Sequence, residues 1–161
     1  MQIKTLVSIS RLLSWFNLSV AGLLCLFALL SAMVFMGLLN ALSPIVLLGS
    51  IVLHSYAALQ LRNSIVTGRP LNRQTSTGIR FIGYIALFFS ILYGGSGIVM
   101  LQNTKEMIRQ IQLPVEYKTL NMTGLFRGIG VFALIFSVTI LGNVVLNFRL
   151  LNWYHSAPRE E

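Results

Sequence analysis

The sequence predicts an all-α membrane protein, folded as an antiparallel four-helix transmembrane bundle. Two observations predict this fold class. The residues are 55% hydrophobic and only 10% charged, and long uncharged runs alternate with shorter segments that carry arginine. A soluble domain carries about 25% charged residues, so this chain lacks the polar side chains that would cover a surface in water. We expect a single domain, because 161 residues is a usual length for one.

Four apolar runs are long enough to cross the membrane, since about 20 helical residues span a hydrocarbon core of about 30 Å. They cover residues about 12–39, 44–61, 81–101 and 128–148. Residues 40–43 read as a turn between the first two runs. Ser43 suits an N-cap and Pro44 the first helical position, so we expect the second helix to begin there.

The two longer connections, 62–80 and 102–120, are polar. In the first, Asn72 is a good N-cap, which predicts that the third helix begins near Arg73.

The second connection has apolar residues at helical spacing. They are Met107, Ile108 and Ile111, and Pro114 would end such a helix. A short interfacial helix and a solvated loop both fit this pattern.

The distribution of basic residues predicts the orientation. Eight of the twelve flank the spans on one side: Lys4, Arg11, Arg62, Arg69, Arg73, Arg80, Arg149 and Arg159. Cytoplasmic loops carry the excess of Lys and Arg, and aromatic residues such as Trp15 and Trp153 collect at the interfaces. We therefore expect a multi-pass protein of the bacterial inner membrane, with the N-terminus, the 62–80 loop and the C-terminus in the cytoplasm.

The sequence carries no constellation typical of an enzyme or a cofactor protein. It has no Asp, and its four Glu all lie outside the predicted spans, which disfavours proton-coupled transport. Two scattered histidines and one cysteine do not make a metal site, and no glycine-rich phosphate loop or nucleophile elbow occurs. The net charge of +8 fits an anionic membrane surface better than a nucleic acid. We therefore expect no catalytic residue, no cofactor, no metal and no nucleic-acid partner.

His54 is the candidate centre of an intramembrane polar site, because it lies deep in the second span. Ser50 lies one turn away, and Tyr93 is a further polar candidate in the third span. Ionisable residues inside membranes are functional hypotheses by default. His54 is then either a ligand-binding or pH-sensing imidazole, or a neutral histidine that hydrogen-bonds across the bundle. We favour the second interpretation.

Small residues spaced four apart predict where helices approach closely. The pairs are Ala28 with Ala32, Ser90 with Gly94, and Gly124 with Gly128. Internal packing is the preferred interpretation, and a homodimer face is the alternative.

The 62–80 loop holds four arginines and no acid: Arg62, Arg69, Arg73 and Arg80. They are candidate contacts for anionic lipids or for a cytoplasmic partner. Arg73 and Arg80 are seven residues apart, on one face of a helix capped by Asn72. The simpler alternative is that these charges only set the topology.

The segment 68–83 resembles the signature of a family of small four-span bacterial membrane proteins of unknown function. Gly68, Pro70, Arg80, Ile82 and Gly83 match that signature in register. The residues after Pro70 depart from it, since leucine and asparagine stand where the family has Phe and then Thr or Ser. The resemblance implies a four-span topology. It also implies a regulatory or signalling partner, because such proteins are often encoded beside small helix-turn-helix regulators.

The preferred function is non-enzymatic: an integral membrane accessory, sensory or regulatory protein that acts through partner or lipid contacts. The alternative is a small oligomeric transporter or channel with a pathway between its helices.

Overall fold

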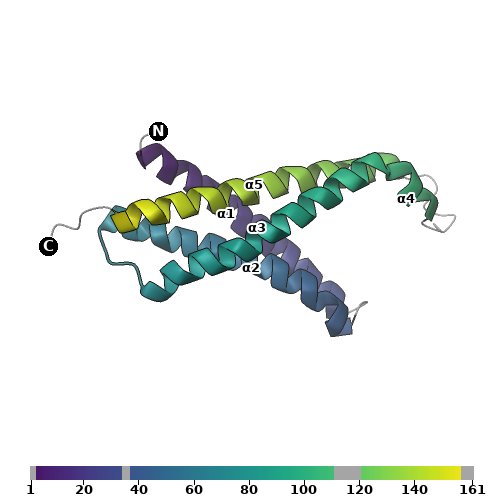
Figure 1. Cartoon of the computed structure of the whole chain (residues 1–161). Helices are drawn as coiled ribbons and strands as arrows, with labels where there is room; N and C mark the ends of the chain where they lie inside the picture. Colours follow the sequence, from purple (N-terminus) through teal and green to yellow (C-terminus); the bar gives the residue numbers. More distant parts are fainter. Residues whose placement is uncertain (1–2, 34–36, 111–120, 157–161) are drawn as a thin grey trace. The chain divides into compact units, whose positions relative to one another are not determined.

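The computed structural model describes residues 3–33, 37–110 and 121–156, and in these ranges it is all-helical, without strands (Figure 1). The helices are α1 (Ile3–Ser31), α2 (Gly37–Thr67), α3 (Arg73–Gln102), α4 (Thr104–Gln110) and α5 (Met122–Ser156). Of these, α1, α2, α3 and α5 are long and apolar enough to cross a membrane. The predicted all-α class is therefore confirmed, as is the presence of four such helices in the described part of the chain.

The helices α2, α3 and α5 extend beyond both ends of the apolar runs that predicted them. The first helix begins at Ile3, before its run over 12–39, but it ends at Ser31. The predicted end at residue 39 is therefore wrong, because residues 37–39 already belong to α2. The last has 35 residues, a length of about 52 Å, which is well above the hydrocarbon thickness of about 30 Å. Apolarity marks the part of a helix that suits lipid and does not mark its ends. Arginine is a good helix former, so a helix can continue through it.

The predicted turn over 40–43 is wrong. Helix α2 begins at Gly37, and Pro44 lies inside it instead of at its first position. A proline removes one backbone donor from the helix, and membrane helices tolerate that loss because neighbouring groups and local adjustments satisfy the freed carbonyl. The Ser-Pro pair therefore looked like a helix start although the helix runs through it.

The connection between α2 and α3 is shorter than the predicted 62–80 loop. Gly68, with φ 68°, directly follows the last residue of α2, where the left-handed conformation of a helix C-cap favours glycine. The amide of Gln74 then donates to Asn72 Oδ1 over 3.0 Å, which confirms Asn72 as the N-cap of α3. Only residues 68–72 separate the two helices.

Of the two alternatives for the segment after α3, a helix and a solvated loop, the structure has the helix over Thr104–Gln110. Ile111 and Pro114, which belonged to the same prediction, lie outside the described residues. The interfacial position of α4 stays a prediction.

The chain forms two compact units, Met1–Phe89 with Thr139–Glu161, and Ser90–Val138. In the first unit, buried apolar side chains from all four long helices form one core cluster: Leu6, Leu61, Ile79, Leu150 and Leu151. The cluster joins the first part of α1, the end of α2, the start of α3 and the end of α5. The prediction of a single domain stays a prediction.

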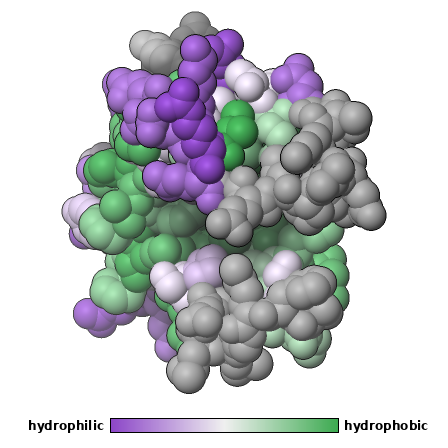
Figure 2. All heavy atoms as spheres, turned by 90° about the vertical axis from the view of Figure 1, so that its right-hand side faces the viewer, coloured by the Kyte–Doolittle hydropathy of each residue, from purple (hydrophilic) through white to green (hydrophobic). Residues whose placement is uncertain are grey.

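Large apolar side chains are exposed on the long helices and next to them, among them Leu12, Met33 and Val66, at 73%, 81% and 72% exposure. Figure 2 shows hydrophobic side chains exposed beside hydrophilic ones on the face that it presents. Soluble monomers rarely expose contiguous apolar patches larger than a few hundred Å². This surface is suited to lipid.

Candidate functional site

A row of buried and half-buried polar side chains connects α1 to α5 in the first unit. The partners on α5 are spaced four residues apart, so they share one helix face. Ser10 Oγ donates to Asn147 Oδ1 over 2.7 Å, Ser14 Oγ donates to Asn143 Oδ1 over 2.9 Å, and Thr139 Oγ1 donates to Asn17 Oδ1 over 2.9 Å. The residue numbers rise along α1 as they fall along α5. These hydrogen bonds therefore set the register of the two helices.

The same row reaches α2 through the two asparagines. Asn147 Nδ2 donates to Asn143 Oδ1 over 3.0 Å and lies 3.4 Å from His54 Nε2. Asn143 Nδ2 lies 3.4 Å from Ser55 Oγ. The two contacts at 3.4 Å are long for hydrogen bonds and correspondingly weak. Asn147 thus contacts side chains of both α1 and α2. We call the side chains of Ser10, Ser14, Asn17, His54, Ser55, Thr139, Asn143 and Asn147 the polar network.

His54 is 1% exposed and fills a space between α2, α3 and α5. Its ring meets the Phe148 ring edge-on, with centroids 6.3 Å apart, and a Cβ added to Gly83 would lie 3.0 Å from His54 Cε1. An amide NH₂ can only donate, so Nε2 must be the acceptor toward Asn147 and the proton of a neutral ring sits on Nδ1. The ring also interacts with the backbone of Ile79, although Nδ1 meets the strict geometry of a hydrogen bond with no group in the part of the chain that the structure describes. This geometry fits the favoured interpretation of His54 as a packed, neutral histidine.

The structure does not join His54 to the polar residues with which the sequence analysis grouped it. Ser50 Oγ donates to the carbonyl of Leu47 in its own helix over 2.6 Å. Tyr93 belongs to the Ser90–Val138 unit, where its ring packs edge-on against Phe136 at a centroid distance of 5.9 Å. Asn147, which the sequence analysis missed, is the residue whose side chain lies within hydrogen-bond distance of His54 Nε2. The sequence feature that could have indicated Asn147 is the four-residue spacing of Thr139, Asn143 and Asn147 within an otherwise apolar run.

The predicted Ser90–Gly94 pair forms the contact between α3 and α5 in the second unit. Ser90 Oγ donates to the carbonyl of Ser137 over 2.8 Å, and Ser137 Oγ donates back to the carbonyl of Ser90 over 2.7 Å. A Cβ added to Gly94 would lie 2.6 Å from Ser137 Oγ. A second close approach follows at Gly97, where an added Cβ would lie 2.9 Å from the carbonyl oxygen of Gly130.

The other predicted small-residue pairs differ in their surroundings. Ala32 is buried and Ala28 is half-buried. Gly124 and Gly128 are exposed; a Cβ at Gly128 would meet nothing within 4 Å, and one at Gly124 would meet only Asn121 just before its own helix. The close helix contact thus falls at Gly130 and not at the predicted Gly124 and Gly128, because the small residue of α5 that faces α3 lies further along the helix.

Three of the four candidate arginines are exposed where α2 passes into α3: Arg69, Arg73 and Arg80. Tyr154 holds the connection in place, since its hydroxyl accepts from the amide of Leu71 over 2.8 Å and donates to the carbonyl of Arg69 over 3.3 Å. Arg80 Nη2 lies 3.4 Å from Asn152 Oδ1. The ion pair found in the described residues joins Arg109 to Glu106, so none of these three arginines forms one there.

Arg62, the fourth candidate, lies apart from the other three. It lines a cavity between α1 and α2 together with Arg11, which the sequence analysis used only for topology. Within the described ranges, no group of three or more His, Cys, Asp or Glu side chains could hold a metal ion.

Comparison with known proteins found no matching family model, no matching curated protein and no matching solved structure. The resemblance of the 68–83 segment therefore stays a prediction.

Proposed function

We propose that this chain is a non-enzymatic integral membrane protein with an accessory, sensory or regulatory role. It acts through contacts between its arginine-bearing end and a cytoplasmic partner or anionic lipids. One observation carries the proposal: Arg69, Arg73 and Arg80 stand exposed on a well-anchored connection and helix start, without an acidic partner in the described residues. Guanidinium groups that are presented in this way suit carboxylate or phosphate ligands.

The proposed architecture is an antiparallel four-helix bundle that crosses the bacterial inner membrane, with both chain ends in the cytoplasm. The core cluster supports this topology, because it joins the first part of α1, the end of α2, the start of α3 and the end of α5. Those are the helix ends that carry most of the basic residues. A bundle with alternating helix directions brings the same four ends to one side.

The alternative, a small oligomeric transporter or channel, would use the polar network as its pathway. We prefer the accessory role because most polar groups of the network already bond to one another across helices. A pathway needs polar groups that are free to exchange partners with a solute.

The proposed topology predicts which cysteines an impermeant reagent can reach in intact cells. On a Cys25→Ser background, Thr67→Cys should stay unlabelled, because the exposed end of α2 would face the cytoplasm. Asn103→Cys, which is exposed between α3 and α4, is the matched control and should label fully. Labelling at position 67 without labelling at position 103 would reverse the orientation.

The proposed docking surface predicts that Arg73 and Arg80 are needed for partner contact. A photo-crosslinking residue at Thr77, exposed on α3 between them, should capture a cytoplasmic protein in living cells. Arg73→Lys/Arg80→Lys keeps the charge and the topology but loses the planar bidentate fork. We expect this variant to reduce the yield of the crosslinked adduct about tenfold. The loss of two contacts, each worth about 1 kcal/mol or less, would have an effect of this size.

The matched control for that experiment is Arg109→Lys/Arg127→Lys, which makes the same exchange at two exposed positions elsewhere in the chain. It should leave the adduct unchanged. If position 77 captured a protein equally well from the parent and the Arg73→Lys/Arg80→Lys variant, these arginines would have only the topological role.

A further inference from the structure

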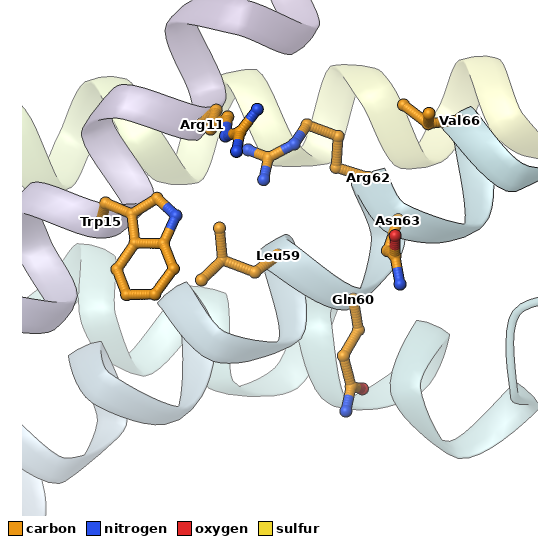
Figure 3. Close-up of a pocket in the computed structure, with 7 residues that line it drawn as sticks. All are labelled: Arg11, Trp15, Leu59, Gln60, Arg62, Asn63 and Val66. Carbon is orange, nitrogen blue, oxygen red and sulfur yellow. The ribbon is translucent and has the colours of Figure 1, made fainter.

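Arg11 and Arg62 lie together at one side of a cavity between α1 and α2. The cavity has a volume of about 390 Å³, and its lining includes Trp15 from α1 and Leu59 and Val66 from α2. Figure 3 shows the two side chains reaching toward each other, with the guanidinium groups at the same side of the cavity. All of these residues belong to the first unit.

The charges in this cavity are unbalanced. In the described part of the chain, no carboxylate lines this cavity, and Nη1 of Arg62 is buried without a hydrogen-bond partner. A buried donor without a partner is costly, and a charged one more so. Two like charges that face each other also repel. A single anion between the two guanidinium groups would satisfy the donors and remove the repulsion.

The surroundings indicate where this anion comes from. Arg62 lies five residues before the end of an apolar helix that ends at Thr67, at the level where a headgroup would be expected. Trp15 is 53% exposed beside the cavity and also lines a second groove of about 350 Å³, together with Arg11, Ile9 and Leu12. The cavity holds the two arginines, and it shares Arg11 and Trp15 with a neighbouring groove that runs along apolar residues. This pair of sites suits a molecule with a phosphate head and a hydrocarbon tail.

We propose that Arg11 and Arg62 bind the phosphate of an anionic phospholipid, with an acyl chain of the same lipid beside Trp15. The inference rests on the proposed membrane location and adds a specific lipid site to the proposed function. It uses neither Arg73 nor Arg80, so the site and the partner surface are tested separately.

The experiment uses Trp15 as the reporter in the full chain. Trp153→Phe leaves a single tryptophan, and the protein is reconstituted into phosphatidylcholine vesicles that contain a small fraction of phosphatidylglycerol. Bromine on the acyl chains of one lipid or the other quenches nearby tryptophan. We expect brominated phosphatidylglycerol to quench Trp15 far beyond its share of the bilayer. Arg11→Gln/Arg62→Gln should lower this preference about tenfold.

Two further variants make the result specific. Lys105→Gln/Arg127→Gln removes two exposed positive charges elsewhere and should keep the preference of the parent. Arg11→Lys/Arg62→Lys retains both charges, so it should fold like the parent even if the glutamine variant does not. It should still lose part of the preference, because lysine lacks the bidentate fork.

Three outcomes would overturn the proposal. The first is equal quenching of Trp15 by both brominated lipids in the parent. The second is a preference in the Arg11→Gln/Arg62→Gln or the Arg11→Lys/Arg62→Lys variant equal to that of the parent. The third is abolition of the preference by millimolar inorganic phosphate, which would assign the site to free phosphate. Failure of membrane insertion would instead appear as absent labelling of Asn103→Cys, and loss of the partner in the Thr77 crosslink.

Discussion

Replacing Gly97 by leucine should separate α3 from α5 in the second unit and destabilise the protein by about 3 kcal/mol, the upper end of the usual cost of overpacking. An added Cβ would lie 2.9 Å from the carbonyl oxygen of Gly130 and 3.2 Å from Ala133 Cβ. A backbone oxygen cannot turn aside as a flexible side chain can, so the helices must move apart. That movement would also break the reciprocal Ser90–Ser137 hydrogen bonds. Thermal denaturation of the purified protein in mild detergent would measure the loss.

Gly95→Leu is the matched control for this substitution. Gly95 lies two residues away on the same helix, is exposed, and would meet nothing within 4 Å on gaining a Cβ. Both exchanges favour the helix by about 0.8 kcal/mol, because glycine is a poor helix former. Gly95→Leu should therefore leave stability unchanged or raise it slightly. Equal stability of the two variants would mean that the close approach at Gly97 does not hold the helices together.

Replacing Asn147 by leucine should cost about 2 kcal/mol. The change removes the acceptor of Ser10 Oγ, the donor toward His54 Nε2 and the donor toward Asn143 Oδ1. Buried polar groups left without partners cost about 1–3 kcal/mol each in general, while individual hydrogen bonds between membrane helices average about 0.6 kcal/mol. The expected loss of stability combines these two costs. Reversible unfolding in detergent would measure it.

A double-mutant cycle with Ser10→Ala isolates the bond between α1 and α5. In the Ser10→Ala background, Asn147→Leu no longer leaves the Ser10 hydroxyl without a partner. The double variant should therefore lose about 0.5–1 kcal/mol less stability than the sum of the losses in the two single variants. Asn152→Leu serves as the control, because Asn152 is exposed and its contact with Arg80 is 3.4 Å long. A stability gain in Asn147→Leu would show that an apolar interior packs better than the polar network, as happens when some buried polar pairs are replaced.

The local sequence was sufficient to predict the elements of this fold. Four long apolar runs predicted four long apolar helices, because only a helix satisfies the backbone of such a run in lipid. Asn72 predicted the start of α3 because capping depends on residues that are close in sequence. The predicted helix start at Pro44 was wrong because the preference of proline for helix starts is only statistical. Long membrane helices tolerate a proline in their interior.

The contacts between helices could not be predicted from the sequence of any one apolar run. Gly124 with Gly128 and Ser90 with Gly94 have the same small-residue spacing, yet only the second pair lies in the contact between α3 and α5. Which face of a helix meets its neighbour depends on the rotation of both helices. The spacing along one of them leaves that rotation open.

The sequence alone determined the all-helical class and the concentration of arginine around residues 62–80, because composition and local propensity act along the chain. Only the tertiary structure decided that Asn147 contacts Ser10 and His54, and that Arg11 and Arg62 line the same cavity. Both arrangements join residues from different helices. Their physical cause is the packing register, in which a rotation of one helix by a single residue would turn each of these side chains away from its neighbours.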